Sequence, residues 1–154
     1  MPVHHVPDGY HSVIPYLVID GAARAMEFYR AAFGAVEVMR MPYPDGRIGH
    51  AEMKIGDAHI MLADEHPDEG HRGPKAFGGS AVSIMIYIAD TDGAVAAAVE
   101  RGATIVRPVE TQFYGDRMGV ITDPFGHVWN VATHVEDVSP EEMERRMKEQ
   151  PDKG

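Results

Sequence analysis

At 154 residues and 44% hydrophobic content, the chain is long enough to bury one hydrophobic core, and its formal net charge of −10 argues against a nucleic-acid partner, which requires a basic surface. It contains no cysteine, which excludes disulfides, thiolate metal sites and cysteine nucleophiles. The chain shows neither a signal-peptide pattern nor an apolar run of about 18 residues, so we expect a cytoplasmic protein without a membrane partner.

The chain contains one pattern twice: a β-rich run, an Ala-rich amphipathic stretch that ends at Gly-Ala, and three further β-rich runs. A repeat of roughly 70 residues that occurs only twice indicates a duplicated βαβββ module rather than a solenoid. In the first copy we expect strands at 12–19, 35–41, 50–55 and 58–63 and a helix at 21–33. In the second copy we expect strands at 81–88, 104–109, 117–122 and 127–133 and a helix at about 92–101.

These elements predict one α+β domain over residues 1–138, with module one at 10–63 and module two at 81–135. The segment 64–80 between them is rich in Gly, Pro and charged residues and has no packing pattern, which is typical of a linker. After the domain, a capping box that begins at Ser139 predicts a C-terminal helix over 139–150. We expect this helix to dock on the body of the protein or on a partner subunit.

Alternate residues of a half-buried strand face opposite sides of the sheet. The apolar set that should face the helices comprises Leu17, Ile19, Ala51, Met53, Ile55, Ile60 and Leu62 in module one, and Ile84, Ile86, Ile88, Met118, Val120, Trp129 and Val131 in module two. The opposite face mixes polar and apolar side chains, which is typical of a small-molecule pocket. On this face and its rim we expect the ligand-binding residues Tyr16, His59, Met61, Ser83, Met85, Tyr87, Tyr114, Arg117 and Asn130.

Several motifs in this order, among them "FYRAAFGA", "IGHAEMKIGDAHIMLADE" and "DPFGHVW", carry a family resemblance. The chain resembles the vicinal-oxygen-chelate superfamily of glyoxalase I, extradiol dioxygenases and bleomycin-resistance proteins, over roughly Tyr10 to His134. It is most similar to a bacterial branch labelled demethylubiquinone-methyltransferase-like. The resemblance implies that the two modules form a curved mixed sheet around a cleft, and that the protein is a homodimer.

Metal enzymes of this superfamily hold one divalent ion with ligands from the first and last strand of each module. Carried over by position, those four ligand sites fall on Ile14, Met61, Ser83 and Asn130, none of which is a good ligand for a hard metal. We therefore expect no metal site of the family type, and neither a typical metal-dependent glyoxalase I nor an extradiol dioxygenase. The sequence leaves open whether another cofactor is used.

His50 and Glu52 are two residues apart on one strand and therefore share a face, where His59 of the paired strand is placed to join them. Such a group suits a relocated metal site or an acid/base pair. The simpler interpretation is a hydrogen-bonded polar cluster. The first functional hypothesis is therefore a protein that binds a small molecule in the inter-module cleft without the usual metal. The alternative is a metal-assisted or acid/base lyase or isomerase with His50 and Glu52 as catalytic residues.

Arg117 and Trp129 of module two also allow two interpretations each. Arg117 is placed to clamp a carboxylate of a ligand, or to form an ion pair with Asp116 within its own loop. Trp129 would suit ligand stacking, but its alternation with Val131 assigns it to the core.

Overall fold

Module one consists of a helix packed on one face of a four-stranded sheet. Its elements are β1 (Tyr16–Ile19), α1 (Ala22–Phe33), β2 (Val36–Pro42), β3 (Ile48–Ile55) and β4 (Ala58–Asp64). The strand order is β1-β4-β3-β2, with β1 parallel to β4 and the other neighbours antiparallel. The computed structural model describes residues 2–151, so Met1, the first residue of the expected domain, lies outside the described residues.

Module two repeats this plan. Its elements are β5 (Ser83–Tyr87), α2 (Thr91–Glu100), β6 (Thr104–Thr111), β7 (Asp116–Thr122) and β8 (Val128–His134). The strand order β5-β8-β7-β6, with β5 parallel to β8, matches that of module one. The duplicated βαβββ fold predicted from the sequence is therefore confirmed.

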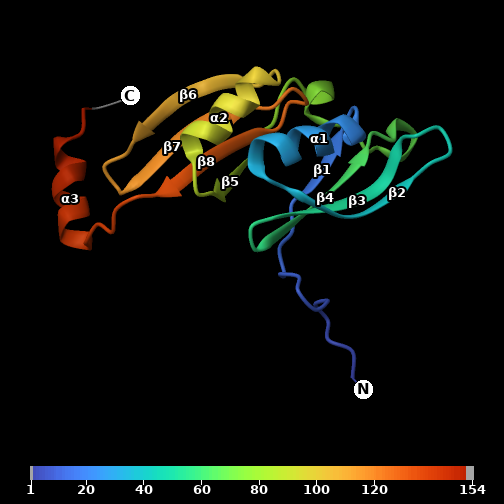
Figure 1. Ribbon diagram of the computed structural model, residues 1–154, viewed down its shortest axis with the longest axis horizontal. Helices are drawn as coiled ribbons and strands as arrows, with labels where there is room; N and C mark the ends of the chain where they lie inside the picture. The colour runs from blue at the N-terminus through green and yellow to red at the C-terminus, as the bar shows by residue number, and fades with distance from the viewer. Residues whose placement is uncertain (1, 152–154) are drawn as a thin grey trace.

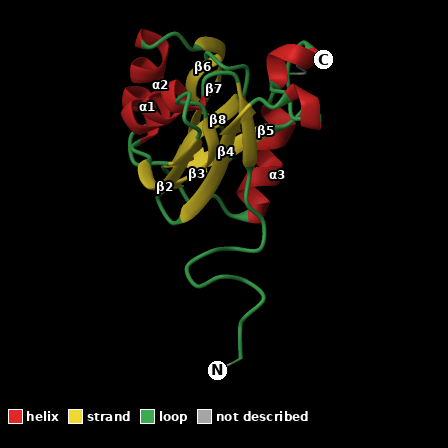
Figure 2. Cartoon of the chain, turned by 90° about the vertical axis from the view of Figure 1, so that its right-hand side faces the viewer, coloured by secondary structure: helices red, strands yellow, loops and turns green. Residues whose placement is uncertain are grey.

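The two helices α1 and α2 contact each other and lie on the same side of the two sheets. Figure 1 shows the modules side by side, and Figure 2 shows the third helix, α3 (Pro140–Glu149), on the opposite side of the sheets. We call the sheet face turned away from α1 and α2 the open face. Large side chains remain accessible on it, since Met85 is 43% exposed and Tyr87 60% exposed.

The segment between the modules contains two short 3₁₀ turns, η1 (Pro67–Glu69) and η2 (Pro74–Phe77). It packs closely against β1 at Gly73, where a Cβ atom would lie 2.9 Å from the backbone oxygen of Val18. A side chain at this position would force the segment away from the sheet.

Helix α1 is capped at its N-terminus by a residue distant in sequence. Asp64, the last residue of β4, accepts hydrogen bonds at Oδ1 from the backbone nitrogens of Gly21 and Ala22, each at 3.0 Å. Its Oδ2 accepts from the Ile48 nitrogen at 2.7 Å, which also ties β3 to this corner. The other end of α1 stops at Gly34 in the left-handed conformation expected there (φ 70°).

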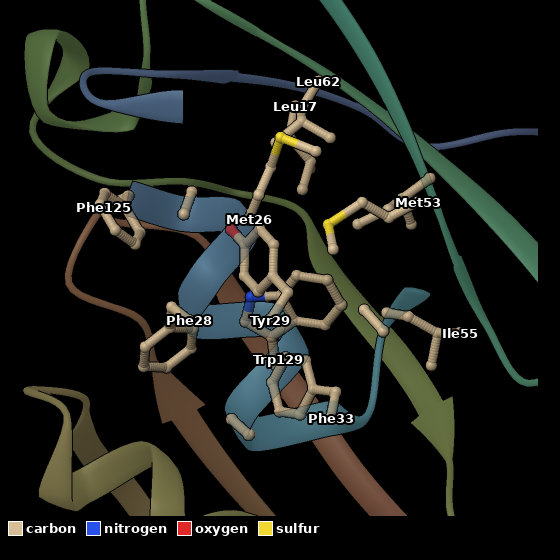
Figure 3. Packing of buried hydrophobic residues seen from close by; sticks show 14 of the residues in the cluster. Leu17, Met26, Phe28, Tyr29, Phe33, Met53, Ile55, Leu62, Phe125 and Trp129 are labelled. Carbon is tan, nitrogen blue, oxygen red and sulfur yellow. The ribbon is translucent and has the colours of Figure 1, made fainter. Parts of the chain in front are cut away.

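The core joins the two modules through aromatic side chains of α1 and β8 (Figure 3). Trp129 is fully buried, as its alternation with Val131 predicted, and its ring centroid lies 4.8 Å from that of Phe33 and 5.1 Å from that of Tyr29. Asp123 is hydrogen-bonded to two of these aromatic side chains. Its Oδ2 accepts from the Tyr29 hydroxyl at 2.7 Å and from Trp129 Nε1 at 2.8 Å. A buried carboxylate thus links module one to module two.

The C-terminal helix has one half of the predicted capping box, because Ser139 Oγ accepts from the Glu142 nitrogen at 3.2 Å while the Glu142 carboxylate pairs with Arg145 and Arg146. Helix α3 has no buried residue. Its main attachment is Arg146, which forms an ion pair with Glu136 and donates to the Phe113 carbonyl oxygen at 2.9 Å.

The prediction for the faces of β7 was wrong. Arg117, expected on the open face, points to α2 and forms a bidentate ion pair with Asp92, with Nε–Oδ2 at 2.6 Å and Nη2–Oδ1 at 2.8 Å. Met118 and Val120, expected to face α2, instead line a cavity on the other face. The apolar pattern misled because the helix side of β7 carries Gly119, which has no side chain to mark it as a core position.

Candidate functional site

A chain of hydrogen bonds crosses the open face of module one. His50 Nε2 lies 2.9 Å from Glu52 Oε2, and the Tyr16 hydroxyl lies 2.8 Å from His50 Nδ1. The other carboxylate oxygen of Glu52 accepts from the hydroxyl of Tyr10. The hydrogen bonds from Tyr10 and His50 lower the pKa of Glu52 from its ordinary value, which keeps it an acceptor. Nε2 then donates to Glu52, and Nδ1 accepts from Tyr16.

His59 lies on the same face but does not join the pair of His50 and Glu52. Its ring stacks on Tyr10, with the centroids 4.0 Å apart, and only 8% of the residue is exposed. Its Nδ1 atom is buried and has no hydrogen-bond partner within residues 2–151. Most buried polar side-chain atoms have a partner in the protein or in ordered water. The imidazole therefore presents an unused polar atom in the interior.

His59 also lines a cavity of about 250 Å³ between the modules. The cavity lies between the β3–β4 hairpin of module one and β5 of module two, where Met85 and Tyr87 contribute to its wall. Three of the expected ligand-binding residues, His59, Met85 and Tyr87, thus come together at one inter-module cavity. Its remaining wall is largely apolar and includes Pro15, Ile60 and Ile84.

Module two carries a second polar network on the open face. The Tyr87 hydroxyl donates to Asp116 Oδ2 at 2.7 Å, and His134 Nδ1 lies 2.9 Å from Asp116 Oδ1. On its other side, His134 Nε2 lies 2.7 Å from Asp137 Oδ1. The carboxylate of Asp116 is almost fully buried, so these contacts supply its partners. The network holds the side chain of Tyr87, a residue of the inter-module cavity wall, in one orientation.

The other expected ligand-binding residues are separated. Asn130 Nδ2 donates to Ser83 Oγ at 2.7 Å, and Met61 is half-buried opposite Glu52 in the strand register. Tyr114 lies in a different cavity, beside Met118 and close to α3. Arg117 does not lie with them, because its guanidinium is held on the helix side of the sheet by Asp92.

Comparison with known proteins is consistent with this geometry. A model described as the Glyoxalase/Bleomycin resistance protein/Dioxygenase superfamily matches residues 5–131. The chain belongs to this superfamily. The uncharacterized protein Rv0887c of Mycobacterium tuberculosis is 41% identical over 90% of this chain and 83% of its own length. The uncharacterized protein At5g48480 of Arabidopsis thaliana is 31% identical over 78% of this chain and 76% of its own length.

Solved structures show the same superfamily fold. The structure of At5g48480 has a TM-score of 0.65 at 28% identity and covers 80% of this chain and 98% of that one. TioX from Micromonospora sp. ML1 has a TM-score of 0.63 at 22% identity, covering 84% and 100%. A putative 3-demethylubiquinone-9 3-methyltransferase, PhnB protein, from Bacillus cereus has a TM-score of 0.62 at 18% identity, covering 80% and 99%. Below 25% identity the likeness concerns the fold alone. Each helix within residues 2–151 is too short or too polar to cross a membrane.

The residues at the four superfamily metal positions do not fit a divalent ion. Ile14 has no donor atom, Met61 offers a thioether, and the amide of Asn130 is already bonded to Ser83. The relocated group does not replace them, because no cluster of three or more His, Asp or Glu side chains within residues 2–151 has the geometry to hold a metal. No step of the proposed function is therefore assigned to a metal.

Sequence reasoning missed three members of the open-face networks. Tyr10 lies in an N-terminal segment without periodicity, so no pattern placed it over Glu52 and His59. Asp116 and His134 lie at strand ends, and for Asp116 the expectation was an ion pair with Arg117. The sequence could have indicated the contact of His134, since pairing β7 with β8 in register places it opposite Asp116.

Because His134 is hydrogen-bonded to two carboxylates, we expect the local stability of the segment that leads to α3 to depend on pH. Hydrogen bonds that His134 donates to the carboxylates of Asp137 and Asp116 raise its pKa above the ordinary value. A raised folded-state pKa contributes stability that is fully present below about pH 6.5 and is lost as the pH rises through the raised pKa. We expect the amide protection factors of Val135 and Glu136, which donate to the Gly115 carbonyl, to fall over that range in hydrogen-exchange measurements. In His134→Gln the same protection factors should show no such step, and a step that persists would assign it to another group.

Proposed function

We propose that this protein binds a small aromatic molecule, about the size of phenol, in the inter-module cavity beside His59, without a metal ion. The observation that carries the proposal is the buried Nδ1 atom of His59, which has no partner within residues 2–151 and belongs to a residue of the cavity wall. Such an atom costs folding free energy unless a partner is supplied. A ligand hydroxyl in the cavity would be that partner once the imidazole ring turns to bring Nδ1 to the cavity surface.

The size and lining of the cavity support an aromatic ligand. Its volume is about 250 Å³, and Pro15, Ile60, Ile84 and Met85 contribute mainly apolar surface. Apolar protein cavities of roughly 150 Å³ bind benzene, so a ring with one hydroxyl fits this space. Tyr87 also belongs to the wall, and the hydrogen bond of its hydroxyl to Asp116 holds its side chain in place.

The experiment compares phenol with toluene, which has similar size but no hydroxyl group. Phenol should bind saturably in ligand-observed NMR titrations, and toluene should bind about ten-fold more weakly, because only phenol satisfies His59. Equal binding of both compounds would contradict the role of His59, and binding of neither would contradict the proposal.

The chain from Tyr16 through His50 to Glu52 favours a second candidate, an acid/base lyase or isomerase. Tyr16 is half exposed and its hydroxyl is within hydrogen-bond distance of His50, whose other nitrogen is held by Glu52. This order allows Tyr16 to exchange a proton with a substrate while Glu52 stabilises a charged His50. Burial, followed by the charge of Glu52, raises the pKa of Tyr16, which keeps the hydroxyl protonated at neutral pH.

The two candidates differ in a measurable proton transfer. The acid/base candidate predicts that the protein accelerates deuterium exchange at the methyl group of acetophenone in D₂O, and that His50→Ala abolishes the acceleration. The binding function predicts no acceleration and unchanged phenol affinity in His50→Ala. Elemental analysis provides a further test, since a stoichiometric transition metal whose removal by a chelator abolishes phenol binding would overturn the metal-free proposal.

We propose in addition that the protein is a homodimer, because Met85 and Tyr87 on the open face form accessible surface of a kind that a second copy would cover. Analytical ultracentrifugation tests this, and a monomer at micromolar concentration would contradict it.

A further inference from the structure

A second, larger cavity lies at the far end of module two, between the open face of β6 and β7 and helix α3. Its volume is about 710 Å³, within the range of pockets that bind drug-sized molecules. Figure 1 shows α3 beyond the end of β6 and β7, and Figure 2 shows it on the side of the sheets away from α1 and α2. The wall combines aromatic, thioether and charged side chains, chiefly Phe113, Tyr114, Met118, Met147, Arg107 and Glu110.

A β-bulge directs both charged side chains into this cavity. Arg107 pairs in register with Val120 and Glu110 with Met118, so the two residues between them on β6, Pro108 and Val109, oppose the single residue Gly119 of β7. In a regular strand, residues three apart would face opposite sides of the sheet. The bulge therefore aligns Arg107 and Glu110 on one face.

The two residues inside the bulge explain its geometry. Pro108 has no N–H group for the ladder, which suits it to an irregular position in the strand. Val109 turns to the helix side and packs over Gly119, where a Cβ atom would lie 2.8 Å from Val109 Cγ2. The bulge thus agrees with the missing N–H of Pro108 and with the packing of Val109 on Gly119.

The charges of Arg107 and Glu110 are not used in ion pairs among residues 2–151, where the nearby pairs are Arg117 with Asp92 and Arg146 with Glu136. Arg107 also lies near Tyr114. Burial and the charge of Asp116 raise the pKa of the Tyr114 hydroxyl, and the charge of Arg107 opposes them. One cation and one anion thus face the same cavity as the Phe113 and Tyr114 rings, whose centroids are 5.3 Å apart.

We infer that this cavity binds a zwitterionic aromatic molecule, with its carboxylate at Arg107, its ammonium group at Glu110 and its ring against Tyr114 and Met118. A purely anionic ligand would be opposed by Glu110 and by the net charge of −10. A purely cationic ligand would leave Arg107 without a partner. The inference is independent of the proposed function, because no residue of the cavity beside His59 takes part in it.

Helix α3 serves as the outer wall of this site. Met147 and Gln150 line the cavity, while Arg146 links α3 to the Phe113 carbonyl in the loop that carries both aromatic rings. Ligand contact and helix docking therefore depend on the same loop.

The experiment uses three probes that share an indole ring: L-tryptophan, indole-3-propionate, which lacks the ammonium group, and tryptamine, which lacks the carboxylate. Isothermal titration calorimetry with the full chain should show tryptophan binding about ten-fold more tightly than either single-charge probe. Arg107→Ala should remove the preference for tryptophan over tryptamine. Glu110→Ala should remove the preference for tryptophan over indole-3-propionate.

Matched controls are Arg101→Ala and Glu100→Ala, which remove exposed charges at the end of α2, outside this cavity. They should preserve the ranking of the three probes, as should His59→Leu. The inference is overturned if the wild-type protein binds none of the probes at millimolar concentration. It is also overturned if Arg107→Ala and Glu110→Ala leave the ranking unchanged while their melting curves match that of the wild type.

Discussion

Asp123→Ala should lower the free energy of unfolding by about 3–5 kcal/mol, because it removes the acceptor shared by both modules from a buried network. Asp123 accepts from Tyr29 and Trp129 with one oxygen, and from the backbone nitrogens of Phe125 and His127 with the other. In the alanine variant these donors lose their partner in the interior. For a chain of this size the loss corresponds to a fall in melting temperature of roughly 10 °C, measurable by circular dichroism.

Two control variants distinguish the effect of losing the hydrogen-bond network from the effect of losing a carboxylate charge. Tyr29→Phe removes one donor and should cost about 1 kcal/mol. Asp57→Ala removes a carboxylate from the exposed β3–β4 turn and should change stability by less than about 0.5 kcal/mol. If Asp123→Ala melted at the same temperature as Asp57→Ala, Asp123 would not be the link between the modules.

His59→Leu should weaken phenol binding about ten-fold while making the unliganded protein more stable. Leucine fills much of the same space and removes the buried Nδ1 atom that has no partner within residues 2–151. The lost stacking on Tyr10 reduces this gain, so we expect a net stabilisation of about 1 kcal/mol and a rise in melting temperature of roughly 2–4 °C. Thermal denaturation with and without phenol measures both effects.

The control for this variant is His11→Leu, which alters an exposed histidine of the N-terminal segment. It should change neither the melting temperature nor the phenol affinity. A destabilised His59→Leu protein would contradict the account, since it would mean that Nδ1 already has a partner in the absence of a ligand.

The sequence was sufficient for the fold because period-two and helical patterns recur in both modules. The same patterns placed Trp129 in the core and His50 beside Glu52 correctly. They failed on β7, where Gly119 and apolar residues on both faces concealed which side meets α2. They also could not reveal the role of Asp123, because its contact with Tyr29 spans 94 positions of the chain.

The candidate site was harder to predict because it depends on register and on segments without periodicity. Tyr10 reaches Glu52 from an irregular arm, and a bulge in β6 aligns Arg107 with Glu110. A bulge changes which face of the sheet the following side chains occupy, and the hydrophobic pattern of the sequence does not show where a bulge lies. Strand alternation alone therefore identifies the open face but not every side chain that belongs to it.

The central claim is that a ligand hydroxyl pairs with Nδ1 of His59, and the chemical shifts of the imidazole nitrogens test it most directly. Long-range ¹H–¹⁵N NMR spectra of the labelled protein should show the His59 Nδ1 resonance moving saturably as phenol is added and remaining in place with toluene. A phenol titration that shifts other histidines, such as His50 or His134, and leaves His59 Nδ1 unchanged would contradict the claim.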